Sequence, residues 1–303
     1  MAARATRSTN RKARVADAVA TGPLGALSHD ELGVVFDGLA DPLQPVVSVA
    51  LSSTCLGLRT PLQAALEVLK ERHERSVALC RKMWTSCRAL RDAESLLHVY
   101  NKGLTADDMA TLGMILCTNG LPRLKMIDLG VNGFGDAGML ALCEGLGQGA
   151  APSLYQLRIG FNEVGPAGAE ALAAALRRGA WPRLETLELY HNPVGNQGVT
   201  ALATSLRNLR LKELNLVNCK IGDEGVTSLL ADLGKDDFKK LEKLYLAKNN
   251  ITDAGVAKLL AALDAGGLPQ LVHHYYLLHD NPASAVAVEA VKHALAKRGA
   301  PVG

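Results

Sequence analysis

The chain has 303 residues, of which 48% are hydrophobic and 21% charged, and its net charge is +3. This composition excludes a disordered or collagen-like chain. Aromatic residues make up only 4%, so Leu, Ala and Val must build the core, which suits thin stacked layers better than one thick core. Because no apolar run reaches the roughly 20 residues of a membrane span, we expect no membrane insertion.

The positive charge is concentrated in two segments. Residues 1–14 contain five Lys or Arg and no acid, and residues 70–91 contain seven against two acids. The rest of the chain is net acidic, which argues against a nucleic-acid partner. We expect residues 1–22 to form a disordered basic tail. Their composition is also typical of an organelle transit peptide or a basic nuclear tail.

The cysteines indicate the cellular compartment. The six of them follow no disulfide-framework spacing and form no CxxC motif. We therefore expect reduced, mostly buried thiols in a cytoplasmic or nuclear protein.

Residues 23–60 lack the repeat pattern found further along the chain and predict two short helices. Ser28 and Glu31 form a capping box at the start of the first helix. Asp41-Pro42 breaks the chain, and a second apolar segment covers 46–58.

This segment resembles an F-box, a short helical motif that docks onto the adaptor subunit of cullin-type ubiquitin ligases. The shared positions are Leu27, Asp30, Leu32, Val35, Phe36, Leu39, Asp41-Pro42, Val49-Ala50-Leu51 and Cys55. The resemblance implies that the adaptor contacts Leu27, Leu32, Val35, Phe36 and Leu39. Two positions depart from the pattern: Ser28 replaces the usual proline, and Pro45 lies where the next helix would start. A degenerate F-box or a plain helical cap is the alternative.

Residues 61–92 predict a helical linker that caps the repeats, with Leu62, Leu66 and Leu69 at helical spacing. We expect Leu79, Met83 and Trp84 to pack on the first repeat, with the basic residues of 70–91 in solvent. The alternative is that this basic stretch, including Trp84, is a docking surface.

Residues 93–303 contain a repeat. Five segments share the pattern LxxLxLxx(N/C), at 124–132, 154–162, 184–192, 211–219 and 241–249. Alternating apolar residues predict a short strand with one buried face. A loop and a helix follow each strand, and acids cluster at several helix starts, where the helix dipole favours them. Paired leucines four residues apart share one helix face: Leu142/Leu146, Leu172/Leu176, Leu202/Leu206, Leu229/Leu233 and Leu259/Leu263.

Two weaker copies flank these five, which makes seven repeats with atypical ends, as capping requires. The landmark positions are 102, 132, 162, 192, 219, 249 and 281. We expect the landmark Asn side chains to bond backbone groups of the loops. Cys219 can do so only weakly, which predicts a local change, and the last strand should be irregular.

These repeats resemble the ribonuclease-inhibitor type of leucine-rich repeat. The resemblance implies an α/β solenoid shaped as a horseshoe, with parallel strands on the concave face and helices outside. It also implies protein binding as the general function.

Two rows of strand residues should be exposed on the concave face. The central row is His98, Asp128, Arg158, Glu188, Asn215, Tyr245 and Leu277, and the second row is Tyr100, Gly130, Gly160, Tyr190, Val217, Ala247 and His279. Tyr and Arg are enriched at protein interfaces, so we expect partner contacts at Tyr100, Asp128, Arg158, Glu188, Tyr190, Asn215 and Tyr245. The small pairs Gly130/Gly160 and Val217/Ala247 should leave room for a partner group. The alternative is a solvated face whose partner binds the rim or loops.

The motifs do not indicate catalysis, a cofactor or a metal site. In a GxGxxG match at 133–138, Gly135 and Gly138 are the recurring loop and helix glycines of the repeats and only Gly133 is extra, so we expect no dinucleotide there. His273, His274, His279 and Asp280 lie close in sequence, but alternating strand residues point to opposite faces. We expect a binding protein rather than an enzyme.

The leading hypothesis is a substrate-recognition subunit of a cullin-type ubiquitin ligase. The first alternative is a repeat scaffold with no ligase role. The second is an activator of a small GTPase, because the repeats also resemble the activator of the nuclear-transport GTPase Ran.

Overall fold

A computed structural model describes residues 36, 39–54, 63–118, 120–231, 233, 237–272 and 276–299. Within them one parallel sheet has the order β1-β2-β3-β4-β5-β6. Its strands are β1 Ser95–Leu96, β2 Met126–Asp128, β3 Gln156–Arg158, β4 Thr186–Glu188, β5 Glu213–Asn215 and β6 Lys243–Tyr245. The helices that alternate with them are α7 Ala106–Thr118, α8 Gly135–Cys143, α9 Pro166–Arg177, α10 Gly195–Arg207, α11 Asp223–Leu230, α12 Asp253–Asp264 and α13 Ala285–Gly299.

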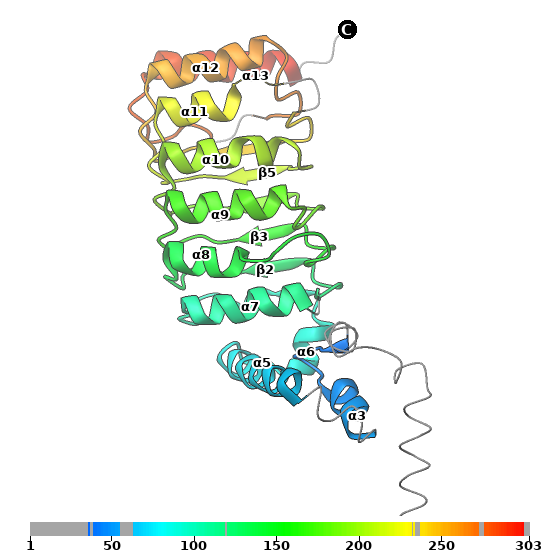
Figure 1. Cartoon of the computed structure of the whole chain (residues 1–303). Coiled ribbons are helices and arrows are strands. Elements are labelled where there is room, and N and C mark those ends of the chain that lie inside the picture. Colours follow the sequence, from blue (N-terminus) through cyan, green and yellow to red (C-terminus); the bar gives the residue numbers. More distant parts are fainter. Residues whose placement is uncertain are drawn as a thin grey trace, which may run out of the picture.

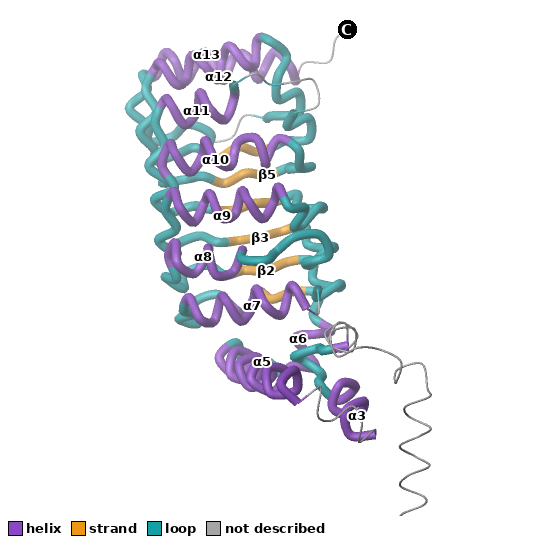
Figure 2. Tube along the Cα trace, viewed as in Figure 1, coloured by secondary structure: helices purple, strands orange, loops and turns teal. Residues whose placement is uncertain are grey.

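The helices stack in chain order on one side of the sheet (Figure 1), and the strands form a second layer behind them (Figure 2). This open arrangement confirms the predicted α/β solenoid. A helix is about 10 Å wide, whereas neighbouring strands lie about 4.8 Å apart. The stack must therefore bend toward the strands, and we call its exposed strand side the strand face.

The strands pair without any shift between repeats. Leu157 pairs with Leu187, and Leu187 pairs with Leu214. The middle residue of each three-residue strand is buried while its neighbours are partly or fully exposed. Equivalent residues of successive repeats therefore stand side by side on the strand face.

The predicted leucine pairs lie within the helix in α9, α10 and α12, as expected. The prediction is wrong for α8 and α11, which end before Leu146 and Leu233. In α8 the cause is local, since Gly145 has φ +75 and turns the chain just after the helix. Leu146 is still fully buried.

A ladder of asparagine side chains joins the loops of successive repeats. Asn162 shows the pattern: its Nδ2 donates to the carbonyls of Leu129 and Ile159, both at 2.9 Å. Its Oδ1 accepts from the backbone N–H groups of Asn132 and Gly133, both at 2.9 Å. The same kinds of bond recur at the other landmark asparagines, Asn132, Asn192, Asn249 and Asn281.

Cys219 interrupts this ladder and confirms the expected local change. Its thiol donates to the carbonyl of Leu189 at 3.3 Å. A thiol is a weak acceptor, and the N–H of Val194 instead bonds the carbonyl of Asn192 at 2.8 Å. The equivalent N–H group one repeat earlier, on Val164, bonds the Asn192 side chain.

A second ladder runs along the helix starts and was not predicted. The Asp136 carboxylate accepts from the N–H groups of Gly165 and Gly168, at 2.7 and 2.8 Å. Asn196, Asp223 and Asp253 repeat this contact one repeat further on. These side chains therefore satisfy the free N–H groups at the start of the next helix.

The seventh repeat has a helix but no strand among its described residues. Residues 273–275 lie outside the description, and Lys248 donates its backbone N–H to the carbonyl of His279 at 2.8 Å. Val291 and Leu295 of α13 are buried.

The helices described with their bounds before the sheet are α3 Val46–Thr54, α5 Gln63–Lys82 and α6 Cys87–Asp92. Leu79 and Met83 are buried in the same core as the repeats, which confirms their predicted packing. The prediction for Trp84 is wrong, because its side chain is 81% exposed. Trp84 follows the end of α5 with φ 56, and this left-handed conformation points the side chain outward rather than onto the core.

The thiols follow the predicted pattern within the described residues. Cys80, Cys143 and Cys219 are buried, Cys87 is half-buried, Cys117 is exposed, and Cys55 lies outside the description. No disulfide joins the described cysteines.

The asparagine ladder predicts the cost of breaking it. Asn162→Ala leaves several buried backbone groups without partners, so we expect a loss of about 4 kcal/mol in the free energy of unfolding. Cys219→Ala should cost only about 1 kcal/mol, because the thiol bonds are weaker. Urea unfolding followed by circular dichroism measures both. Asn208→Ala at the exposed end of α10 is the control, and its free energy of unfolding should change by no more than about 0.5 kcal/mol. Equal losses for all three variants would contradict a structural role of the ladder.

Candidate functional site: the strand face

Five of the expected contact residues form one continuous row. Each is the last residue of its strand, and strand pairing places each beside the next. We call Asp128, Arg158, Glu188, Asn215 and Tyr245 the central row. The side chain of His98, the expected first member, lies outside the description.

Ion pairs organise the first half of the central row. Arg158 Nε lies 2.9 Å from Glu188 Oε1, and Arg158 Nη1 lies 3.6 Å from Asp128 Oδ2. The two carboxylate side chains are only 13% and 14% exposed. Charge-assisted bonds in such a shielded place hold the Arg158 side chain in one geometry.

Burial makes the charge on Glu188 costly. It raises the pKa of Glu188 above its ordinary value; the attraction of Arg158 offsets only part of this effect, and Glu213 on β5 adds repulsion. A cationic partner group near Glu188 would therefore relieve an existing penalty.

Asp128 and Asn215 also brace the loops behind their strands. Asp128 Oδ1 accepts from the N–H of Gly130 at 2.9 Å, and Asn215 Oδ1 accepts from that of Val217 at 3.1 Å. These two side chains are partly structural, so a partner has less freedom to reorient them.

The second row departs from the prediction at its small residues. A Cβ atom on Gly160 would lie 2.4 Å from the Tyr190 ring, and one on Gly130 would lie 3.0 Å from the Tyr100 ring. The expected open space at these glycines is therefore filled by tyrosine rings from the neighbouring repeats. Ala247 is fully buried, so the prediction of open space at Val217 and Ala247 is wrong as well.

An aromatic cluster beside Tyr190 was missed from the sequence. The Phe161 ring stacks on the His191 ring with centroids 4.1 Å apart and meets the Tyr190 ring edge-on at 5.5 Å. Asn218 Nδ2 lies 2.8 Å from His191 Nδ1. Burial, followed by repulsion from Lys248, lowers the pKa of His191, so this ring is neutral at pH 7.

The position of this cluster depends on the backbone. Each residue just before a landmark has a left-handed φ between 53 and 57: Asn101, Val131, Phe161, His191, Asn218, Lys248 and Asp280. We call these seven the rim residues. These residues recur at the same position of successive repeats, and this recurrence is the sequence feature that could have identified the cluster. Their left-handed conformation was not anticipated, because it is uncommon for residues with a Cβ.

In the last repeat, a residue other than the expected one continues the central row. Leu277 is buried rather than exposed, whereas Tyr276 is 48% exposed with its ring centroid 6.3 Å from that of Tyr245. The irregular backbone of this repeat changes which side chain faces solvent. Tyr276 therefore takes the place predicted for Leu277.

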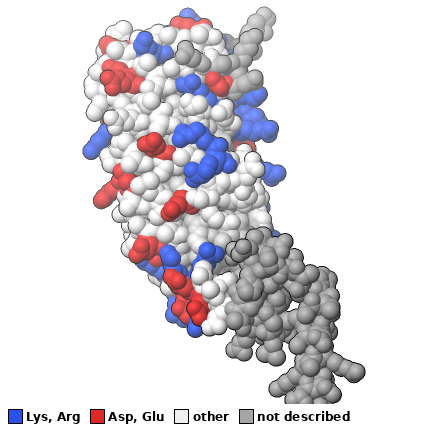
Figure 3. Space-filling model, viewed as in Figure 1, with Lys and Arg blue, Asp and Glu red and all other residues white. Residues whose placement is uncertain are grey.

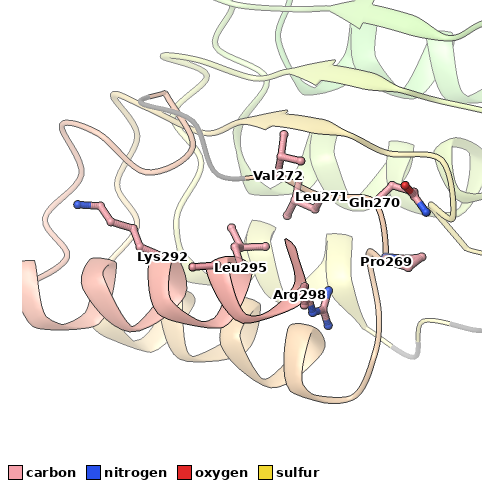
Figure 4. Close-up of a pocket in the computed structure, with 8 residues that line it drawn as sticks. Pro269, Gln270, Leu271, Val272, Lys292, Leu295 and Arg298 are labelled. Atoms are coloured by element: carbon pink, nitrogen blue, oxygen red, sulfur yellow. The ribbon is translucent and has the colours of Figure 1, made fainter. Parts of the chain in front are cut away.

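A cavity of about 530 Å³ lies at the C-terminal end, between α13 and residues 269–272. Leu271 and Leu295 project toward each other into the space between the two segments (Figure 4). The Arg298 guanidinium donates to the carbonyls of Leu263, Gly267 and Leu268. Its charged group is thus engaged in anchoring α13.

The GxGxxG match at 133–138 has a packing explanation. A Cβ on Gly138 would lie 2.5 Å from the Phe134 side chain. The Asp136 carboxylate at this helix start binds the next repeat.

Among the described residues no three His, Cys, Asp or Glu side chains gather as metal ligands. His279 Nε2 lies 3.1 Å from Asp280 Oδ1, whereas His273 and His274 lie outside the description.

Charges of both signs are interspersed on the opposite, helical side, with wide uncharged areas between them (Figure 3). None of the described helices has both the length and the apolar character needed to cross a bilayer.

The expected adaptor contacts lie in the N-terminal segment. Leu27, Leu32 and Val35 fall outside the described residues. Phe36 is fully buried, whereas Leu39 is 41% exposed.

The buried charge on Glu188 predicts a pH effect. Because burial raises the folded-state pKa, Glu188 destabilises the fold as pH rises through about 4.5, its ordinary value. We expect Glu188→Gln to gain stability relative to wild type as pH increases from 3 to about 7. Thermal unfolding across this range measures the difference. Glu170→Gln on the exposed surface of α9 is the control. If the stability of Glu188→Gln relative to wild type falls with rising pH, the raised pKa of Glu188 is contradicted.

Comparison with known proteins agrees with the architecture. The Leucine Rich repeat family model matches residues 150–173, 183–203, 207–230 and 239–260. No curated protein sequence matches the chain. The matched segments run from β3 into α12, where strands and helices alternate most regularly. Residues 150–260 therefore contain leucine-rich repeats, the described strands and helices form an open α/β solenoid, and these repeats indicate a protein-interaction module.

Proposed function

We propose that the strand face recognises a partner protein and that the chain is the substrate-recognition subunit of a cullin-type ubiquitin ligase. One observation carries the recognition role: the aromatic cluster of the exposed Phe161 and the half-buried Tyr190 and His191 adjoins the ion-paired Arg158. Aromatic residues and arginine carry most of the binding energy at protein interfaces.

The rigidity of this region supports the same role. Arg158 is held by two carboxylates, and the Tyr190 ring rests on Gly160 of the neighbouring repeat. Side chains that are already ordered lose little entropy when a partner binds. The repeat length of about 30 residues, with a strand and a helix in each, supports assignment to the ribonuclease-inhibitor type.

The ligase role is supported by the N-terminal segment. The sequence of residues 27–58 resembles an F-box, and α3 begins directly after Pro45, whose carbonyl accepts from the N–H of Val49 at 3.0 Å. Proline is therefore compatible with the start of this helix. Leu39, Val46 and Val47 are exposed apolar side chains that an adaptor can cover, whereas the buried Phe36 stabilises the segment from inside.

Partner binding is tested by quantitative affinity purification with mass spectrometry. We expect Phe161→Ala and Tyr190→Ala to reduce recovery of specific partners about tenfold or more, the usual cost of truncating a hot spot. Tyr155→Ala is the matched control, because Tyr155 is 37% exposed and precedes the strand outside the face. Circular dichroism verifies folding. Full retention of every partner by the two variants would show that binding occurs elsewhere.

The ligase role needs a separate experiment. Purified adaptor should bind the full chain, and Leu39→Asp should weaken this binding at least tenfold, since a carboxylate would be buried at the contact. Val286→Asp on α13, where Val286 is 81% exposed, should bind normally. If wild type recovers no adaptor, the ligase role is wrong and the chain acts as a scaffold, whatever the strand-face variants show.

A further inference from the structure

Trp84 is an exposed tryptophan that lies outside the buried core. It follows the end of α5, and its side chain is 81% exposed. The other tryptophan, Trp181, is 1% exposed. A fully exposed large aromatic side chain at the end of a helix is a recognised feature of binding surfaces rather than of folding.

The backbone at Trp84 strengthens this point. The N–H of Thr85 bonds the carbonyl of Cys80 at 2.9 Å, and that of Trp84 bonds the carbonyl of Arg81 at 3.0 Å. These two bonds form a Schellman cap, whose left-handed position usually holds glycine. Trp84 occupies it with φ 56, so the fold accepts strain here. Trp181 also has a positive φ of 51, but its buried ring offsets the strain.

One cation contacts the ring, and two more lie close to Trp84 in the sequence. Lys102 Nζ lies 3.1 Å from the centroid of a Trp84 ring. Arg81 and Arg88 are exposed and lie within four residues of Trp84. Within the described part of the chain no carboxylate lies within ion-pair distance of these three cations, whereas neighbouring Lys82 is paired with Asp108. We call Arg81, Trp84, Arg88 and Lys102 the Trp84 patch.

We propose that the Trp84 patch binds an acidic segment of a partner protein. An apolar side chain of that segment packs on the indole, and its carboxylates pair with Arg81, Arg88 and Lys102. Charge complementarity selects this occupant. The chain's own first 14 residues carry five cations and no acid, so the patch repels them.

An anionic membrane fits less well. The exposed surface of α5 alternates the acids Glu67, Glu71 and Glu74 with the cations Lys70 and Arg75, so a negatively charged bilayer lying along this helix would gain little attraction from it. A compact acidic peptide can contact the end of α5 without meeting these residues.

This site goes beyond the proposed function and does not rest on it. The patch lies at the first-repeat end of the solenoid, and Lys102 follows the strand-face residue Tyr100 by two positions. A partner that covers the strand face can therefore extend onto the patch, but each surface can be removed separately.

The test is selection from a random peptide display library on the full chain, run in parallel on wild type and on Trp84→Gly. Glycine suits the left-handed cap, so this variant should fold with an equal or higher Tm. We expect peptides rich in Asp and Glu with an apolar residue to be enriched on wild type and depleted at least tenfold on the variant. An equal enrichment on both proteins, or a selected set without acidic residues, overturns the proposal.

The leading selected peptide is then titrated against the protein while tryptophan emission is followed. Because Trp181 is buried, a shift to shorter wavelength on binding reports Trp84. Arg88→Glu should weaken the peptide about tenfold, whereas Lys258→Glu on the exposed surface of α12 should not. The assignment is overturned if phosphatidylserine vesicles shift the emission and the acidic peptide does not. It is also overturned if the shift comes from self-association of the chain, which sedimentation detects.

Discussion

The asparagine ladder is the interaction on which the rest of the molecule depends. Strands of two or three residues leave some backbone groups of the adjoining loops without a partner in the sheet, and a buried unpaired group costs about 1–3 kcal/mol. Asn162 supplies both a donor and an acceptor to backbone groups of the preceding repeat as well as its own. A leucine at this position would fill the space but leave these groups unsatisfied. Each repeat thereby fixes the position of the one before it.

The strand face follows from that fixed spacing. Because every repeat stacks without a register shift, Arg158 lies between Asp128 and Glu188 and can pair with both. The same stacking lets the Tyr190 ring cover Gly160, where a side chain would block it. The candidate site is thus assembled entirely from contacts between neighbouring repeats, and no single repeat contains it.

The two ends of the solenoid have different chemistry from its middle. At the N-terminal end α5 covers the first repeat and exposes Trp84 with its cations. At the C-terminal end Arg298 anchors α13 to backbone carbonyls of the preceding repeat. An end repeat must pack against the core on one side and face water on the other. Its residues therefore meet different surroundings from those of the central repeats.

The sequence by itself determined the repeat, its buried leucines, the role of the landmark asparagines and the weak point at Cys219. These features are local, because a period of about 30 residues places each side chain in the same environment in every copy. Tertiary structure alone decided that tyrosine rings fill the space above Gly130 and Gly160, that Tyr276 replaces Leu277, and that Phe161 stacks on His191. It also decided that Trp84 faces solvent. Each of these depends on side-chain direction or on a left-handed backbone, and neither is encoded in hydrophobic periodicity.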